Sequence, residues 1–574
     1  MASQQVSPPR ASSDEPRPKT SLSSDGRPDS VLEKPVLDAT PTTDADAGSG
    51  ATTDAGPPAD EENEYYKPKT LRFWLVIAST FVTMFLVALD RTILATAIPR
   101  ITDEFKSLGD IGWYGSAYML ATAAFQLVFG RIYTFYDLKW TLLTCIFIFE
   151  VGSAICGAAP NSPVFILGRS IAGIGSAGIM TGSIMTVVPL VPLHKRPMFQ
   201  ALFAVVFGVA SVSGPLIGGA FTDRVTWRWC FYLNLPIGAA AFAFLATFKF
   251  PTKPKSELSV ARQILQLDPI GTLFFVPAVA SLLLALQWGG STYEWSNWRI
   301  IVLFVCFGIG AAAFITVQIM MPESASLPVR VIKNRAVYLG GTNMLFLSGS
   351  MMLCVYYIPF WFQTTQNVNP VDSGVYTIPL VLSLVVGSIV SGAISQKCGY
   401  VNPSMIIGVC FNIIGEGLLT TFTPTTGSPH WIGYQFLTGF GIGFGMQAPN
   451  LAIQASIDKK DIPTGMAITF FAQQLGGAIF VTVGQTILST VVVSRLAGLP
   501  GLDANAVIRA GATELHKIVK PEYIPNVIDA FNHACVVIFL TAVVLTACQV
   551  LTVLGMPWAS IKKGAPKKTK PEQA

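Results

Sequence analysis

The sequence predicts an all-α membrane protein with 14 transmembrane helices, in two six-helix halves plus two inserted helices. Apolar residues make up 51% of the 574 residues and charged residues only 12%, about half the charged share of a typical soluble protein. The apolar residues also fall into runs of about 20, which is the length that crosses a bilayer at about 1.5 Å per residue. Finally, some early runs resemble later runs that lie a fixed number of residues further along the sequence.

Residues 1–70 differ from the rest of the chain. They contain 7 Lys or Arg, 13 Asp or Glu and ten prolines. Low hydrophobicity with excess charge predicts a disordered cytoplasmic tail. Either the tail is regulated by phosphorylation, or it is solvated and has no fixed role. We see no signal peptide before the first apolar run, so this run is expected to act as the membrane anchor.

Fourteen apolar runs follow the tail, and each is expected to form a transmembrane helix. Their ranges are 74–98, 111–133, 141–159, 164–190, 198–222, 229–248, 269–288, 299–321, 336–362, 372–395, 402–422, 431–456, 464–491 and 533–556.

Loop charges predict the orientation of these helices. The loops after even-numbered runs hold 14 Lys or Arg, against 5 in the short loops after odd-numbered runs. The positive-inside rule then places the even-numbered loops and both termini, including the basic tail 559–574, in the cytoplasm. The loop 492–532 falls outside, and its alternating pattern predicts a short surface helix over 507–519.

An internal repeat supports two related halves. Adding 258 to the triplet at 218–220 gives a second Gly-Gly-Ala, and adding 266 to positions in the third and fourth runs gives four more matches. These four matches are Glu150 on Glu416, Ser162-Pro163 on Ser428-Pro429, Arg169 on Gln435, and Gly173 and Gly175 on Gly439 and Gly441. We therefore predict halves at 71–250 and 336–558, with a linker and two inserted helices at 251–335. Halves that meet at a midplane site are a transporter architecture.

Four segments resemble a known family when read in order. They are LDRTILATAIP at 89–99, Gly168-Arg169-Ser170 with Gly173 and Gly175, a glycine pattern in the fifth run, and Trp227-Arg228-Trp229. The glycine pattern consists of Gly208, Gly214, Pro215, Gly218 and Gly219. The chain resembles the fourteen-span drug:H+ antiporters of the major facilitator superfamily, especially fungal efflux pumps for toxins and other secondary metabolites. In that family the fifth-run pattern marks exporters.

One motif of that family is degraded here. The loop after the second run usually reads Gly-x-x-x-Asp-Arg/Lys-x-Gly-Arg/Lys-Arg/Lys, but residues 130–139 read GRIYTFYDLK. Only Gly130 and Lys139 match, Thr134 replaces the acid, and Asp137 lies three residues further on. The resemblance implies a cytoplasmic gate at Gly130, Asp137 and Lys139, and the missing acid puts its charge lock in doubt.

Charges inside apolar runs are functional candidates, because burying them in a membrane is costly. Asp90 and Arg169 lie about 12 and about 10 Å from the outer ends of their helices, so the two charges reach the same depth and can pair. A carboxylate that loses its guanidinium partner more readily takes up a proton, which would couple proton transfer to a conformational change. A purely structural salt bridge is the alternative. Glu150 is the next proton-coupling candidate, although the resemblance places its helix at the periphery.

The substrate cavity is predicted from the resemblance, which implies that the first, fourth, ninth and twelfth runs and their neighbours line it. The polar and aromatic candidates in these runs are Tyr118, Gln126, Tyr357, Trp361, Gln435, Gln447, Asn450 and Gln473. Amides and aromatic rings without extra fixed charges suit a bulky, mostly apolar, neutral ligand. Part of the aromatic set could instead form an interfacial belt.

Several function classes are excluded by sequence pattern. The GxGxxG at 173–178 has no preceding strand, and we find no P-loop and no catalytic constellation. We therefore expect no enzyme activity, cofactor or metal, and the scattered basic residues argue against nucleic acid as a partner. The expected function is proton-coupled efflux of small amphipathic organic compounds by a monomer.

The membrane expected from the resemblance is the plasma membrane, with a vacuolar or vesicle membrane as the alternative. The expected partners are a small-molecule substrate, protons and the lipid bilayer. An importer or siderophore carrier of the same fold, or a non-transporting membrane sensor, remains an alternative function.

Overall fold

The computed structural model describes residues 70–107, 110–248, 250, 259–290, 293–322, 324–497 and 519–562, which belong to one compact unit. The predicted tail at 1–70, the surface helix at 507–519 and the basic tail at 559–574 lie almost entirely outside these residues. So does most of the linker that precedes the inserted helices.

The described residues are helical, with isolated bridges only at Gly289–Tyr293 and Tyr400–Ser560. The helices of the first part of the chain are α1 (Leu71–Phe105), α2 (Ile111–Phe135), α3 (Leu138–Ala158), α4 (Ser162–Leu190), η2 (Leu193–Lys195), α5 (Arg196–Arg224), α6 (Trp229–Tyr232) and α7 (Asn234–Thr247). The middle part forms α8 (Val260–Leu265), α9 (Pro269–Trp288), α10 (Trp298–Met320) and α11 (Val329–Ile332). The last part forms α12 (Arg335–Thr365), α13 (Pro370–Val375), α14 (Ile378–Cys398), α15 (Asn402–Leu419), α16 (Ser428–Met446), α17 (Ala448–Ser456), α18 (Ile462–Leu496), η3 (Pro521–Tyr523) and α21 (Ile524–Gly555).

The prediction of an all-α membrane protein is confirmed. Each predicted run coincides with one long helix or with two consecutive helices. Among the described residues, 12 helical segments have the length and hydropathy of a membrane span. The remaining two runs are α2 and the α16–α17 pair, which do not meet that criterion. A count of 14 spans is thus compatible with the structure and stays a prediction.

Caps and prolines explain where several helices begin and break. The side chains of Asn161, Asn297 and Asn334 accept hydrogen bonds from the first turns of α4, α10 and α12, which satisfies amides that have no partner within the helix. Between α16 and α17 the helix is interrupted at Gln447, two residues before Pro449. Proline has no backbone N–H to continue a helix, so this position is a natural break.

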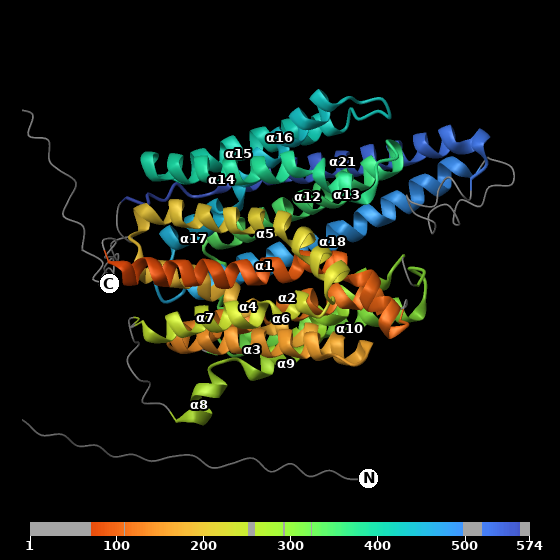
Figure 1. Cartoon of the computed structure of the whole chain (residues 1–574). Coiled ribbons are helices and arrows are strands. Elements are labelled where there is room, and N and C mark those ends of the chain that lie inside the picture. The colour runs from red at the N-terminus through yellow and green to blue at the C-terminus, as the bar shows by residue number, and fades with distance from the viewer. Residues whose placement is uncertain are drawn as a thin grey trace, which may run out of the picture. The chain divides into compact units, whose positions relative to one another are not determined.

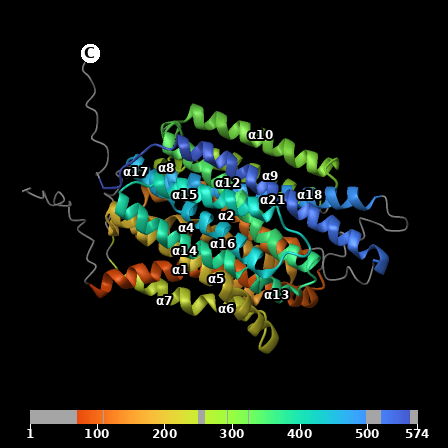
Figure 2. The same cartoon turned by 90° about the horizontal axis from the view of Figure 1, so that it is seen from above.

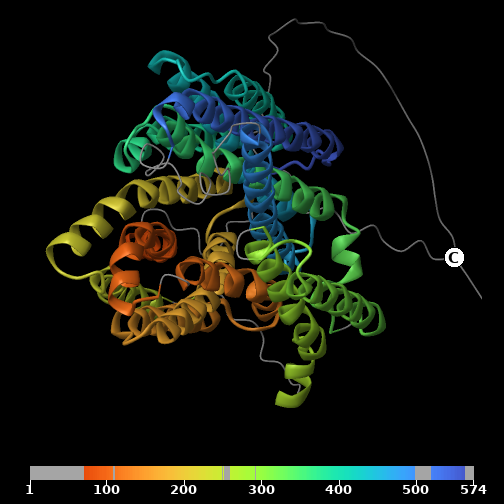
Figure 3. The ribbon, with the colours of Figure 1, turned by 90° about the vertical axis from the view of Figure 1, so that its right-hand side faces the viewer.

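The long helices run side by side (Figure 1). Helix α4 packs on α2 and α3, and α1 packs on α5 and α7; in the later part, α16 packs on α14 and α15, and α12 packs on α18 and α21. Seen along the helices, α1–α4 (orange and gold) and α14–α16 with α21 (teal and blue) lie on opposite sides (Figure 3). Helices α5–α7 belong to the first group, and α12 and α18 belong to the second. The contacts α5–α14 and α2–α18 join these two groups.

The two inserted helices form a hairpin on one side of this arrangement. Helix α9 packs on α10 and also contacts α2 and α18, one from each predicted half. Helix α10 lies at the edge in the view from above (Figure 2). Only 11% of its most apolar stretch is buried within the protein, so its apolar side chains are free to face lipid.

Glycine contacts show the internal repeat in space. A Cβ on Gly152 of α3 would collide with the backbone of Ala172 in α4, and a Cβ on Gly415 of α15 would collide with the backbone of Thr438 in α16. These equivalent contacts map α4 onto α16 with the predicted offset of 266, but α3 onto α15 with an offset of 263. The contacts of Gly175 with Phe149 and of Gly441 with Asn412 give the same two offsets.

The predicted pairing of Glu150 with Glu416 is therefore wrong by about one helical turn. With the α3–α15 offset, Glu150 corresponds to Ile413, and Glu416 corresponds to Ser153. The connection between α15 and α16 is longer than the one between α3 and α4, and it accommodates the three extra residues.

Candidate functional site

A buried ion pair joins α1 to α4. Nη1 of Arg169 lies 2.5 Å from Oδ2 of Asp90, and the two side chains are 1% and 0% exposed. Nε of Arg169 also donates to the backbone carbonyl of Tyr114 in α2, at 2.9 Å. The prediction that these two charges meet at the same depth is confirmed, whereas their role in proton coupling remains a prediction.

The second half makes the same kind of contact without the charge. Gln435 occupies the position of Arg169 in the repeat, and its Nε2 donates to the carbonyl of Tyr376 at 3.0 Å. Tyr376 lies two residues before the first residue of α14, and Tyr114 lies in the first turn of α2. The polar contact between neighbouring helices is thus common to both halves, and only the first half adds a carboxylate. This asymmetry makes the Asp90–Arg169 pair the candidate site for chemistry.

Tyr118 of α2 lies between two guanidinium groups. Its ring centroid is 4.6 Å from Cζ of Arg169 and 5.4 Å from Cζ of Arg91. A cation over an aromatic face is stabilised by about 0.5–2 kcal/mol. The Tyr118 side chain is fully buried, so the ring helps to hold two positive charges close to one carboxylate.

Arg91 is a site residue that the cavity prediction missed. Its Nη2 lies 3.7 Å from the sulfur of Met180 in α4, and Nε2 of Gln474 in α18 lies 4.0 Å from the same sulfur. A residue of the first half and one of the second half thus converge on Met180. The available signal was the arginine itself, because a charge on a membrane helix is a functional candidate. The expectation of a substrate cavity without extra fixed charges stays a prediction.

The other predicted cavity residues divide into two groups. Some make hydrogen bonds within the protein: Gln126 donates across helices to Thr181 of α4 at 2.7 Å, and Asn450 of α17 donates to Gln447, three residues earlier, at 3.4 Å. Gln473 is half-buried beside Gln474. Tyr357 is 5% exposed, and a Cβ on Gly484 of α18 would collide with its ring.

Trp361 is in a different environment from the one predicted. Its indole N–H donates to Asn532 of α21 at 2.8 Å, and its ring centroid lies 4.3 Å from that of Phe422. The side chain is 0% exposed. In this structure Trp361 is therefore a core residue among α12, α21 and the segment after α15, and no part of its side chain is open to a ligand.

Glu150 and Glu416 both face the last helix of their own group. A Cβ on Gly238 of α7 would collide with the carboxyl group of Glu150, and neither Glu150 oxygen has a hydrogen-bond partner among the described residues. Glu416 accepts a hydrogen bond from Thr546 of α21 at 2.7 Å. Both carboxyl groups thus lie in packing contacts with a neighbouring helix.

The glycines of the exporter pattern bring α5 close to α1. A Cβ on Gly214 would collide with Thr92, and one on Gly218 with Thr96 and Ile93. Gly208 instead meets Val385 of α14, Pro215 lies inside α5, and Gly219 has open space around its Cβ position. The Thr92 hydroxyl donates across the same contact to the carbonyl of Ala210, at 3.0 Å.

The predicted cytoplasmic gate is a contact between α2 and α18. The hydroxyl groups of Thr134 and Thr464 lie 3.3 Å apart, and a Cβ on Gly130 would collide with Ala467. Thr134 thus joins the two groups of helices by a neutral contact at the position where the family has its acid.

Lys139 does not take part in this contact, which corrects its predicted role. It donates to the backbone carbonyl of Ala246 near the end of α7. Asp137 precedes the first residue of α3, and its side chain makes no cap hydrogen bond to that helix. The contact between α2 and α18 therefore involves the beginning of the degraded motif, around Gly130 and Thr134.

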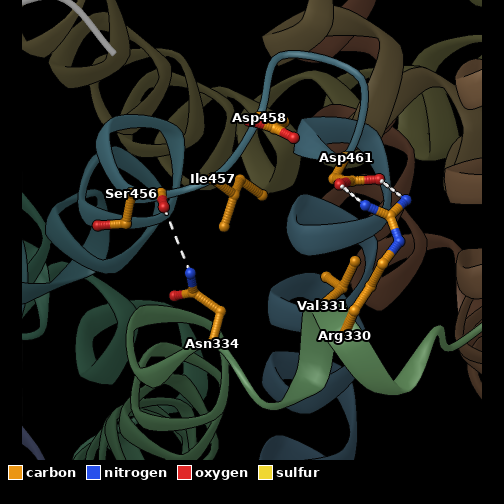
Figure 4. A pocket seen from close by; sticks show the side chains of 7 residues that line it. All are labelled: Arg330, Val331, Asn334, Ser456, Ile457, Asp458 and Asp461. Carbon is orange, nitrogen blue, oxygen red and sulfur yellow. Dashed lines mark hydrogen bonds and ion pairs between the residues drawn. The ribbon is translucent and has the colours of Figure 1, made fainter. Parts of the chain in front are cut away.

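The segment after the inserted helices supplies a charged contact at the same end of the molecule. Both terminal nitrogens of Arg330 in α11 donate to the carboxylate of Asp461, which precedes α18 (Figure 4). A cavity of about 230 Å³ lies beside this pair and is lined by Arg330, Val331, Asn334, Ser456, Ile457, Asp458 and Asp461. Arg131 of α2 donates to the carbonyl of Gln266 at 3.0 Å, so the linker before α9 is attached to α2.

Asp268 organises both ends of the inserted hairpin. Its side chain is 3% exposed and accepts hydrogen bonds from Gln318 of α10 at 2.6 Å, from the Ser326 amide at 3.0 Å and from the Gly271 amide at 2.8 Å. A buried carboxylate with three donors is well stabilised. The hairpin therefore connects the linker attached to α2 with the segment attached to α18.

Comparison with known proteins identifies the family. The sequence profile described as Major Facilitator Superfamily matches residues 80–481. The efflux pump aflT of Aspergillus parasiticus is 45% identical over 497 residues, which cover 86% of this chain and 97% of that protein. The rubrofusarin-specific efflux pump aurT of Gibberella zeae is 46% identical over 503 residues, covering 88% and 92%.

Solved structures show the same fold. The proton:xylose symporter XylE has a TM-score of 0.53 at 14% identity, covering 85% of this chain and 98% of that one. The human organic anion transporter MFSD10 has a TM-score of 0.52 at 13% identity. At this identity the likeness concerns the fold alone, and it agrees with the predicted major facilitator fold. The chain belongs to the major facilitator superfamily and is a multi-pass membrane transporter of small molecules.

Proposed function

We propose that this chain exports small amphipathic organic compounds, such as a fungal secondary metabolite, in exchange for protons. The observation that carries the proposal is the fully buried Asp90–Arg169 pair, in a chain whose relatives of 45% and 46% identity are named efflux pumps. The name of aurT states the substrate of that relative. We extend only the class of compound, a fungal secondary metabolite, to this chain. Plasma-membrane location and a monomeric state are part of the same proposal.

The ion pair offers a way to couple a proton to a change of shape. An unprotonated Asp90 attracts Arg169 strongly, because charges interact over a low dielectric inside the protein. Protonation of Asp90 removes that attraction and leaves Arg169 with Tyr114 and the ring of Tyr118. The packing of α1 on α4 then changes with the proton, as coupling requires.

The contacts between the two groups of helices define the proposed cytoplasmic gate. In this arrangement, Thr134–Thr464 and Arg330–Asp461 hold α2 and α11 to the start of α18. Opening of the cytoplasmic side requires both contacts to separate. The domain boundaries 71–250, 251–335 and 336–558 are proposed as the bodies that move.

Transport by purified protein in proteoliposomes tests the energy source. With a fluorescent amphipathic dye as the probe, we expect accumulation that depends on an imposed pH gradient and collapses when a protonophore is added. ATP should have no effect in this assay. Arg495→Gln is the matched control, because Arg495 pairs with Asp529 near the end of α18 and is 41% exposed. Dye movement that persists after the gradient has collapsed, and that then depends on ATP, would contradict the proposal.

A further inference from the structure

We propose that Arg91 binds an anionic group of the substrate, so that the transported compounds are weak organic acids carrying a carboxylate or phenolate on an aromatic skeleton. This inference rests on the proposed export function and specifies its substrate class. It replaces the neutral ligand that the sequence alone predicts.

The donors of Arg91 are poorly used within the protein. Its Nε is buried and has no hydrogen-bond partner among the described residues, and Nη2 contacts only the thioether of Met180 at 3.7 Å. A guanidinium has five N–H donors, whereas a thioether sulfur is a weak acceptor. Leaving such donors without acceptors costs free energy. A ligand with a strong acceptor that reaches Arg91 therefore gains more binding free energy than it would from a donor already bonded to water.

The charge balance also favours an anion. Asp90 is the nearest carboxylate along the chain, and Arg169 already holds it at 2.5 Å. In the described part of the chain, Arg91 forms no ion pair, although Arg169, Arg228, Arg330 and Arg495 each do. The cluster of Asp90, Arg91 and Arg169 therefore carries one surplus positive charge, which an anionic substrate would neutralise.

The surroundings of Arg91 suit an aromatic acid. The side chain is half-buried rather than sealed, and Gln474 of α18 directs its amide to the same sulfur atom from the other group of helices. A carboxylate that displaces this weak contact could accept from both Arg91 and Gln474. Because Arg91 of α1 and Gln474 of α18 belong to different halves, a ligand held by both would touch both moving bodies, as a transported substrate must.

A binding experiment without any gradient tests the inference. The probes are 9-anthracenecarboxylate and its amide, which share a ring system and differ in charge. We expect the detergent-purified full chain to bind the carboxylate about tenfold more tightly than the amide, a difference typical of one well-placed charged contact. Arg91→Gln should reduce this preference to about twofold or less, whereas Arg91→Lys, which keeps the charge, should retain a clear part of it.

Three results would overturn the inference. In the first, the wild-type protein does not bind the carboxylate or does not prefer it to the amide. In the second, Arg91→Gln keeps the preference. In the third, the Arg495→Gln control loses the preference as much as Arg91→Gln does. Thermal melting without ligand, measured on each variant, shows that the compared proteins are folded. Since no gradient is present, the carboxylate preference can hold even where proton coupling fails, and the two proposals are judged separately.

Discussion

Arg330 holds Asp461 with both of its terminal nitrogens, at 2.6 and 2.7 Å. Arg330 follows the inserted hairpin and Asp461 precedes α18, so this one pair attaches the inserted helices to the second half. Two parallel N–H···O bonds fix the orientation of the pair better than a single contact would. We propose that this pair and the Thr134–Thr464 contact together replace the charge lock that the degraded motif cannot form.

Cross-linking should trap this closed end. In the double variant Thr134→Cys with Thr464→Cys, we expect a disulfide to form under mild oxidation, because the native hydroxyl groups are 3.3 Å apart. The cross-link should abolish dye transport in proteoliposomes, and a reductant should restore it. Peptide mass spectrometry identifies the linked pair.

Arg330→Gln should weaken the same closure. We expect the Thr134–Thr464 cross-link to form several-fold more slowly in this background, whereas Arg495→Gln should leave its rate unchanged. The expected effect is modest because Arg330 is 57% exposed, and solvent screens exposed pairs to about 1 kcal/mol or less. An unchanged rate in Arg330→Gln would show that the ion pair does not contribute to closure.

Two neighbouring glycines of the exporter pattern should respond differently to the same change. A Cβ at Gly218 would meet the Thr96 side chain and the Ile93 carbonyl, whereas one at Gly219 would meet open space. We expect Gly218→Ala to lower stability by about 1–3 kcal/mol through overpacking and to impair transport, and Gly219→Ala to leave both nearly unchanged. Melting temperature and dye transport, compared between the two variants, give the result. Equal behaviour of the pair would mean that the α1–α5 contact adapts to added volume.

Acid sensitivity is expected at the connection between α5 and α6. Burial alone would raise the pKa of Glu104, but the hydrogen bond from Trp227 at 2.6 Å and the ion pair with Arg228 at 2.8 Å outweigh it and lower the pKa. A carboxyl group whose pKa is lowered by folding stabilises the folded protein at pH values above its ordinary pKa. This stabilisation is lost as the pH falls towards the pKa of the group in the folded protein. Glu104→Gln should therefore flatten the acidic side of the melting-temperature profile, by a small amount because Glu104 is 47% exposed.

The sequence predicted the fold and the central ion pair because both follow from the membrane. Apolar runs of spanning length become helices, and a charge buried in a membrane is stabilised by an opposite charge at the same depth. The surroundings of Arg91 were out of reach, because Gln474 lies far along the chain and only the packing of α18 brings it near. The register error at Glu150 had a local cause. Three extra residues in the loop between α15 and α16 shift the correspondence of α3 with α15 by about one helical turn. A single offset of 266 therefore paired Glu150 with Glu416, although the two do not correspond in the structure. The role of Lys139 depended on where α7 ends, which no motif specifies.

The Asp90–Arg169 pair offers the decisive comparison of a coupling role with a structural one. Asp90→Asn keeps the size and much of the hydrogen bonding but cannot carry a proton, so we expect folded protein at the membrane without gradient-driven transport. Arg169→Gln should also be inactive, because it leaves the Asp90 carboxylate buried without its 2.5 Å partner.

The double variant, Asp90→Asn with Arg169→Gln, separates the two roles. Removing one member of a buried pair costs about 3–5 kcal/mol, whereas removing both often costs little. Gln435 already shows that an amide can make the interhelical contact at this position of the repeat, so we expect the double variant to recover the expression and melting temperature that Arg169→Gln loses. If the pair couples protons, transport must stay lost in that well-folded protein. Full proton-driven transport by the double variant would instead make the pair a structural tie between α1 and α4 and leave Glu150 as the next candidate.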